Sequence, residues 1–289
     1  MENFETLIRK KRAQLTKAQL RILTYILDNI EEAIFLNATK LGKKVSVSES
    51  SVIRLSQSLG FEGYPAMQRK LQEHFNYRVS TIGRLNQTLT DLKDTDSVFV
   101  KSIQDDINNL NETLRRISKE TFEQAVSDMW SAQRIFIIGF KQAHAPALVL
   151  ASSIGHFKEG VHLIESKAGY IWDSLYGIGN KDLVIGISFP RYSRLTIEVL
   201  EYAKKHNANI GAITDSFVSP LAAYANWLLE VKCKSESLFE SYTTSMSIVN
   251  ALITALSLKD PKGTMRTMEA REKLWREKRM IFSRKKDTI

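Results

Sequence analysis

Hydrophobic residues in the first 77 positions recur at helical spacing and show no strand-like alternation. The pattern predicts one buried stripe on a first long helix, formed by Leu20, Leu23, Leu27 and Ile30. Thr16 and Gln19 precede this stripe with the spacing of a capping box, in which each side chain accepts a hydrogen bond from the other residue's backbone N–H. Further helices are expected over residues 37–44, from Ser48 and from Tyr64. We therefore expect an all-α domain over residues 1–77.

Polar sequence rich in threonine and aspartate interrupts the helical pattern over residues 78–98, which we interpret as a linker. Helical spacing then returns through Ile103, Ile107, Leu110, Leu114 and Ile117. After Trp130 the pattern changes to short apolar runs, which are RIFIIG, VHLI, DLVIGIS, NIGAIT and NWLLEVK. Strands that alternate with helices predict an α/β domain with a doubly wound parallel sheet. We place this domain at residues 99–258, with a closing helix over 238–258 and a basic helical tail over 259–289.

Charge is distributed unevenly along the chain, whose formal net charge is +9. Basic residues outnumber acidic ones by 13 to 8 over residues 1–80 and by 11 to 5 over 259–289, whereas residues 81–258 hold 17 against 19. Basic ends around a neutral middle favour contact with a polyanion such as nucleic acid. One cysteine, Cys233, cannot form an intramolecular disulfide, and no apolar run approaches the roughly 18 residues of a membrane span. We expect a cytoplasmic protein with no membrane partner.

The segment LGKKVSVSESSVIRLSQSLGFEGY, residues 41–64, has the layout of two helices joined by a short turn. Ser48 can cap the second helix, and short hydroxyl side chains at its start permit close approach to a DNA groove. Arg54 can reach a phosphate or a guanine edge. The candidate DNA-binding residues are Lys43, Lys44, Ser46, Ser48, Glu49, Ser50, Ser51, Arg54 and Gln57. An ordinary helical hairpin is the alternative interpretation.

A second candidate site is SFPRYS, Ser188–Ser193, which follows an apolar run and leads into an amphipathic helix. A strand that passes through serine and arginine into a helix has the layout of an anion site in an α/β protein, because helix starts present free N–H groups. An ordinary strand-to-helix turn is the alternative.

The segment VSVSESSVIRLSQSLGFEGYPAMQRKL resembles the amino-terminal domain of RpiR-family bacterial transcriptional regulators. The matching positions are Val47, Ser48, Val52, Arg54, Leu59, Gly60, Phe61, Gly63 and Tyr64. Gly42 departs from the family, which usually has alanine there. The resemblance implies a double-stranded DNA operator as partner. Because one recognition helix reads few base pairs, we also expect a homodimer or homotetramer.

The second domain of that family is a sugar isomerase (SIS) domain that binds a phosphosugar effector, and TDSFVSPLAAYANWLLEV resembles one of its stretches. The usual phosphate loops read Gly-x-Gly-x-Ser and Ser-x-Ser-Gly-x-Ser/Thr. In this chain Lys141 and Ala143 replace the second glycine and the serine of the first loop, and Pro190 and Arg191 replace Ser-Gly in the second. The resemblance implies effector-binding residues in the two loops, and Ser241 joins them because of its place at the start of the closing helix. The candidates are Gly139, Lys141, Gln142, Ser188, Arg191, Ser193 and Ser241.

Two interpretations of these replacements stay open. The cations could take over from the lost hydroxyls, since a guanidinium meets a phosphate or carboxylate with two parallel hydrogen bonds. Alternatively, the site reads another acidic metabolite, or nothing. The SFPRYS form resembles a subgroup of these regulators, which favours a working site for a phosphosugar or another small anionic metabolite.

A sugar-phosphate isomerase is the second function that the sequence allows. Isomerisation needs a base beside the sugar, for which Glu198 and Glu240 are the candidates. The five histidines show no metal-ligand spacing, and no nucleotide-binding loop is present, so we expect neither metal nor cofactor. An attached DNA reader favours sensing over turnover, and we predict that the chain is not an enzyme.

Overall fold

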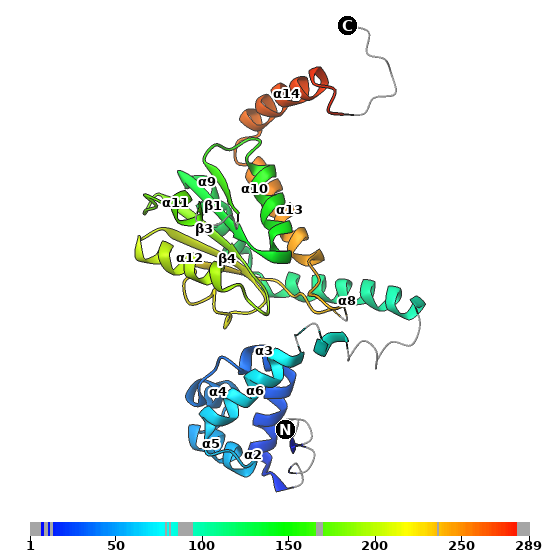
Figure 1. The fold of residues 1–289 in the computed structure, drawn as a ribbon, viewed down its shortest axis with the longest axis vertical. Coiled ribbons are helices and arrows are strands. Elements are labelled where there is room, and N and C mark those ends of the chain that lie inside the picture. Colours follow the sequence, from blue (N-terminus) through cyan, green and yellow to red (C-terminus); the bar gives the residue numbers. More distant parts are fainter. Residues whose placement is uncertain are drawn as a thin grey trace.

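The computed structural model describes residues 14–78, 95–165, 170–235 and 237–281, with positions 7, 8, 11, 80 and 82–85 beside them. The end of the expected basic tail, residues 282–289, lies outside the described residues. A helical body near the amino terminus and an α/β body follow one another along the long axis of the molecule (Figure 1).

The helical body contains α2 (Lys17–Asp28), α3 (Ile30–Ala33), α4 (Ala38–Val45), α5 (Glu49–Ser58) and α6 (Tyr64–Arg78). The capping box at the start of α2 is confirmed, because Gln19 N–H donates to Thr16 Oγ1 at 3.3 Å and Thr16 N–H donates to Gln19 Oε1 at 2.9 Å. The helices enclose one apolar core.

The predicted stripe on α2 is wrong in part. Leu27 is 39% exposed and Leu20 is only half-buried, whereas Ile22 and Ile26 are fully buried. The helix is apolar on more than one side, and α5 packs on the side of Ile22 and Ile26, where Gln19 Nε2 also donates to Ser58 Oγ at 2.8 Å. Spacing alone could not decide between the two faces.

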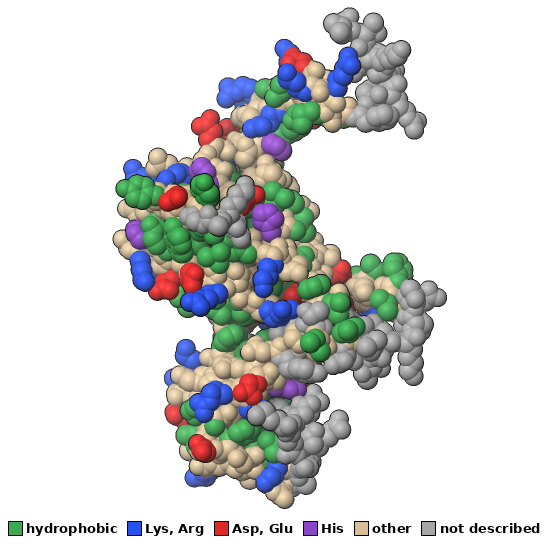
Figure 2. Space-filling model, viewed as in Figure 1, with side chains coloured by type: hydrophobic (Ala, Val, Ile, Leu, Met, Phe, Trp, Pro, Cys, Tyr) green, Lys and Arg blue, Asp and Glu red, His purple; other side chains and the backbone are tan. Residues whose placement is uncertain are grey.

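Two helices connect the helical body to the sheet, namely α8 (Thr95–Arg116) and α9 (Lys119–Ser131). The first of these begins at Thr95, inside the segment expected to be a linker. Its predicted apolar positions do recur at helical spacing, but four of them face solvent: Ile103, Ile107, Leu110 and Leu114. Figure 2 shows hydrophobic side chains gathered along this helix.

Five parallel strands form the sheet, as the apolar runs predict: β1 (Arg134–Gly139), β2 (Val161–Ile164), β3 (Asp182–Ile187), β4 (Asn209–Thr214) and β5 (Trp227–Glu230). Their order is β2-β1-β3-β4-β5. Alternate residues of β1 enter different cores, with Ile135 and Ile137 on one face and Phe136 and Ile138 on the other. A doubly wound sheet needs this burial on both faces.

Helices cover both faces of the sheet (Figure 1). One face is covered by α9, α10 (His144–Ile154) and α13 (Thr243–Ser257), and the other by α11 (Tyr170–Ser174) and α12 (Arg194–Lys205). The closing helix therefore begins at Thr243, later than the predicted residue 238. The last helix, α14 (Pro261–Glu277), has no buried residue and extends away from the sheet. None of the described helices is long and apolar enough to cross a bilayer.

Candidate effector and DNA-binding sites

The strand order places a crevice between β1 and β3, at their carboxyl ends. These strands are neighbours, yet α10 follows β1 onto one face of the sheet while α12 follows β3 onto the other. The two connections therefore diverge and leave space between them, which is where doubly wound proteins bind ligands. Both loops singled out from the sequence begin at this point.

A hollow occupies this crevice, and we call it the strand-end hollow. Its lining residues are Phe140, Lys141, Gln142, Ala143, Ser188, Phe189, Pro190, Arg191, Ser193, Phe239, Glu240 and Tyr242. Five of the seven sequence-predicted effector residues are therefore brought together, although they come from segments about 50 residues apart.

Gly139 and Ser241 do not line the strand-end hollow. Gly139 is buried at the end of β1, where a Cβ atom would lie 2.2 Å from the carbonyl oxygen of Ala143. Its role is to let the loop fold back closely on the strand. Ser241 instead donates its hydroxyl to Asp106 on α8.

Both cations of the strand-end hollow stand in left-handed backbone. Lys141 has φ of 55° and Arg191 has φ of 67°, in the region that glycine enters most easily. Lys141 and Arg191 stand where the usual phosphate loops have glycine. The loops thus keep a glycine-like path while presenting exposed positive side chains. Non-glycine residues in this conformation cost of order 1–3 kcal/mol each and concentrate at functional sites.

The two serines hold the shape of the second loop. Ser188 is buried, and its Oγ accepts a hydrogen bond from Ser193 N–H at 3.1 Å. Ser193 caps α12, with its Oγ accepting from Thr196 N–H at 3.4 Å. The start of α12 and its positive dipole end are thereby held next to the hollow.

Sequence reasoning did not assign Phe239, Glu240 or Tyr242 to the effector site: it chose Ser241 from the same segment and considered Glu240 only as a base for the isomerase alternative. Glu240 pairs with Arg84 at 2.5 Å, so its charge is compensated. Burial raises the pKa of Tyr242 well above its ordinary value, and the nearby Glu240 and Cys233 add to this effect. The Tyr242 hydroxyl therefore stays a proton donor at neutral pH. The sequence shows that side chains alternate in direction along the segment before the closing helix. It does not show which of the two sets faces the strand-end hollow.

The predicted turn between α4 and α5 is present. The left-handed residue Ser46 ends α4, and Ser48 caps α5 by accepting from Ser51 N–H at 3.3 Å. Gly42 has a reason to be glycine here, since a Cβ atom would lie 2.9 Å from the carbonyl oxygen of Val47. The buried side of α5 consists of Val52, Leu55 and Ser56.

The predicted DNA-binding residues divide into two groups. Lys43, Ser46, Ser48, Ser50, Arg54 and Gln57 are exposed, and Ser51 is half-buried. Lys44 and Glu49 have intramolecular partners instead, with Lys44 Nζ at 2.7 Å from Glu32 and Thr39 donating to Glu49 at 2.7 Å. The guanidinium of Arg54 has no partner among the described residues, which leaves it available to a ligand.

The comparisons with known proteins match both parts of the chain. A model of the helix-turn-helix domain of the rpiR family matches residues 2–77, and a model of the SIS domain matches residues 128–255. The chain therefore joins a helix-turn-helix domain of the rpiR family to a SIS domain.

Curated relatives of this chain include several helix-turn-helix transcriptional regulators. HexR of Pseudomonas aeruginosa is 22% identical over 90% of both chains, and an uncharacterized regulator of Haemophilus influenzae is 22% identical over 74% of this chain and 75% of its own. The sugar isomerase domain of an RpiR transcription factor from Sphaerobacter thermophilus superposes with a TM-score of 0.58 at 25% identity, covering 60% of this chain and 97% of that one. Vibrio vulnificus NanR, solved with ManNAc-6P, has the same fold with a TM-score of 0.60 at 19% identity, over 92% and 97%.

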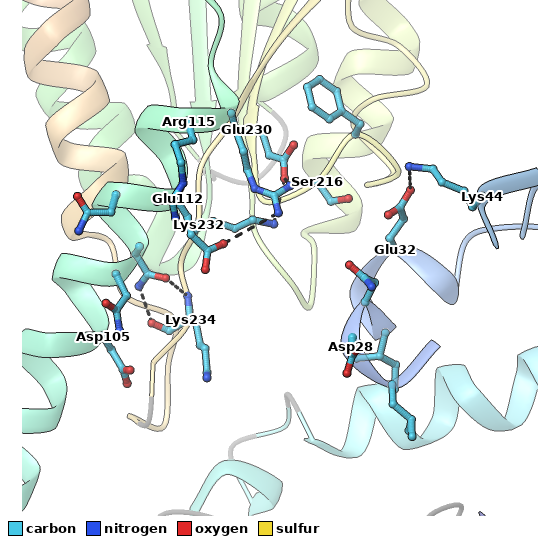
Figure 3. A pocket seen from close by; sticks show the side chains of 18 residues that line it. Asp28, Glu32, Lys44, Asp105, Glu112, Arg115, Ser216, Glu230, Lys232 and Lys234 are labelled. Carbon is cyan, nitrogen blue, oxygen red and sulfur yellow. Dashed lines mark hydrogen bonds and ion pairs between the residues drawn. The ribbon is translucent and has the colours of Figure 1, made fainter. Parts of the chain in front are cut away.

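A cavity of about 790 Å³ lies between the two bodies rather than at the strand ends. Figure 3 shows Glu32 and Lys44 reaching it from the helical body, with Glu230 and Lys232 opposite. Several of its charges are paired: Arg116 and Lys232 lie 2.6 and 3.0 Å from Glu230. Burial disfavours ionisation of Glu32, yet bonds from Lys44 and Tyr25 lower its pKa overall. We interpret this cavity as the polar seam between the bodies, whereas the charged residues that line the strand-end hollow are Lys141, Arg191 and Glu240, two basic and one acidic.

Proposed function

We propose that this chain is a transcriptional regulator that binds duplex DNA through α4 and α5 and senses a small anionic metabolite in the strand-end hollow. The observation that carries the proposal is the pair of cations, Lys141 and Arg191, at the switch point of a sheet joined to a helix-turn-helix domain. The phosphosugar bound by NanR supports a ligand of the phosphosugar class. The proposed division of the chain is residues 1–77, 78–98, 99–258 and 259–289.

On DNA, the exposed start of α5 would enter the major groove. The Ser48 hydroxyl lies 2.9 Å from the hydroxyls of Ser50 and of Ser51. These side chains have little bulk, so the backbone can approach base edges closely. Arg54, one turn later, would reach a phosphate or a guanine. Lys44 and Glu49 would have to exchange their present partners to take part.

In the strand-end hollow, the anion would meet Lys141 and Arg191, with the Tyr242 hydroxyl as a neutral donor. Phe140, Phe189 and Phe239 supply apolar walls, which suit the ring of a sugar more than a bare inorganic ion. The charged groups of Arg191 and Lys141 would attract the anion and also donate hydrogen bonds to it, whereas the hydroxyls of the usual loops can only donate hydrogen bonds.

Neither candidate base of the enzyme alternative is suitably placed. Glu198 pairs with Arg194 at 2.7 Å on the outer side of α12 and does not line the hollow. Glu240 does line it, but the ion pair with Arg84 holds its carboxylate. A general base must be free to accept a proton within hydrogen-bond reach of the substrate, so we propose sensing without catalysis.

The proposal is tested with the full chain and a DNA duplex that it selects from a random pool. We expect Arg54→Ala to weaken binding and to reduce the slope of log affinity against log salt by about 0.9, the value for one lost phosphate contact. Arg194→Ala, at a position 92% exposed on α12, is the matched control and should keep the wild-type slope. Equal slopes for wild type and Arg54→Ala would show that α5 is not the reader.

A further inference from the structure

The loop Ser188–Ser193 touches both the strand-end hollow and the helical body. Ser188, Arg191 and Ser193 line the hollow, whereas the Tyr192 ring lies 6.2 Å from the Phe35 ring, measured between centroids, at an interplanar angle of 59°. This separation is within the range of direct aromatic contacts. Phe35 lies in the helical body, between α3 and α4. Neighbouring residues of one short loop therefore face a ligand site and the DNA-binding body.

Tyr192 is anchored on the side of the sheet. Its hydroxyl donates to both carboxylate oxygens of Asp215, at 2.9 and 3.0 Å. Asp215 is 1% exposed and directly follows β4, and Thr214 Oγ1 donates to it at 3.1 Å. Hydrogen bonds to a buried carboxylate are stronger than those between neutral groups. These hydrogen bonds therefore tie the position of the Tyr192 ring to the carboxyl end of β4.

Phe35 is anchored on the side of the helix-turn-helix. The carbonyl groups of its two neighbours accept hydrogen bonds of 2.6 to 3.0 Å from three side chains of α6, which are Tyr64, Gln68 and Gln72. Two residues later, Asn37 caps α4 by accepting from Lys40 N–H at 2.9 Å. Because α4 packs on α5, a displacement of Phe35 would also shift the surroundings of the recognition helix.

A second contact between the bodies starts from the same anchor. Val218, three residues after Asp215, packs against the apolar core of the helical body. In Figure 1, α3 lies at the end of the helical body that faces the α/β body. Both contacts therefore connect to the Tyr192–Asp215 hydrogen bond.

We propose that the Tyr192–Phe35 contact couples ligand binding in the strand-end hollow to the position of α4 and α5. This inference rests on the proposed function, because it needs both an anion and DNA as ligands. An anion held by Arg191 favours one arrangement of the loop, and the adjacent Tyr192 ring then favours one arrangement of the helical body. Such a contact changes DNA affinity only to the extent that the anion binds the two arrangements with different affinity. DNA then changes the affinity for the anion by the same factor.

The test compares Phe35→Ala and Tyr192→Phe with wild type in the full chain. DNA affinity is measured on the selected duplex with and without ManNAc-6P or inorganic phosphate, and affinity for each probe is measured by calorimetry. We expect the probe to change wild-type DNA affinity within the general range for coupled sites, roughly 5- to 150-fold. Phe35→Ala should reduce this change to about twofold or less while probe affinity stays within about twofold of wild type. Tyr192→Phe, which keeps the ring and loses the bond to Asp215, should give an intermediate change.

The matched control is Tyr176→Ala, at a position 83% exposed, which should keep the full probe effect. A wild-type-sized probe effect in both Phe35→Ala and Tyr192→Phe would overturn the inference. A wild-type chain that binds DNA and a probe with no effect of one on the other would overturn it too, while leaving both binding sites in place. Failure of wild type to bind DNA or either probe would instead remove the proposed function.

Discussion

At the scale of single residues, Arg191 combines a charge with an unfavourable backbone conformation. Its φ of 67° favours glycine, so Arg191→Gly should raise the free energy of unfolding by about 0.5–1 kcal/mol, after the greater freedom of the unfolded chain is subtracted. The same change removes the guanidinium and should weaken phosphosugar binding by roughly tenfold or more. Urea unfolding and calorimetry with ManNAc-6P measure the two effects.

Arg191→Ala separates the two contributions, because it removes the charge and retains the strained backbone. We expect it to lose as much probe affinity as Arg191→Gly without the gain in stability. If Arg191→Ala binds the probe like wild type, the charge of Arg191 plays no part in the strand-end hollow.

At the scale of secondary-structure elements, one ion pair joins the neighbouring strands β1 and β3 where their ladder begins. Arg134 on β1 lies opposite Asp182 on β3, donating from Nε to Oδ1 at 2.9 Å and from its terminal nitrogen to Oδ2 at 2.7 Å. Asp182 is 4% exposed; burial disfavours its charge, but Arg134 and the Gly179 N–H hold its pKa below the ordinary 3.8. Asp182→Asn should therefore lower the free energy of unfolding at pH 7 by about 3 kcal/mol.

The pH dependence of that difference follows from the direction of the pKa shift. A carboxyl whose pKa is lowered by folding stabilises the protein above its unfolded pKa and loses this effect as the pH falls through the folded value. Wild type and Asp182→Asn should thus converge in stability as the pH falls through the lowered pKa of folded Asp182, which lies below 3.8. Urea unfolding at several pH values checks this, and a gap that persists at low pH would contradict the assigned cause.

The elements that the sequence predicted well are those whose signal is local. Each apolar run became a strand, because a strand buried on both faces must be apolar throughout, and Thr16 and Ser48 form caps from atoms within three residues. The loops of the strand-end hollow were also located, since parallel strands end at one edge. The buried face of α2, the role of Tyr242 and the contact between Phe35 and Tyr192 were not predictable, because each depends on which distant segment packs against it.

At the scale of the whole molecule, the packing of a single chain does not explain why α8 turns its apolar side to solvent. Its inner side is polar, with Asn109 exchanging hydrogen bonds of 2.7 and 3.1 Å with the backbone of Lys234 and Thr113 accepting from Lys232 N–H at 2.9 Å. Its outer side is apolar, and the exposed fractions reach 70% at Phe99 and 81% at Leu114. Exposed apolar surface of this kind is typical of interaction sites. We propose that a second copy of the chain covers it, since paired DNA half-sites require a symmetric dimer.

A charge placed on that outer side should dissociate the dimer while the fold persists. Ile107 is 45% exposed, so Ile107→Glu adds no buried charge to the single chain but leaves an unpaired charge inside the proposed interface. With roughly 2 kcal/mol lost, the dissociation constant of the dimer should rise by about 30-fold. Sedimentation velocity over a concentration series measures it, and Leu258→Glu, 67% exposed outside α8, is the control. DNA affinity should fall in parallel with dimer content, because a monomer engages one half-site; an unchanged assembly in Ile107→Glu would place the interface elsewhere.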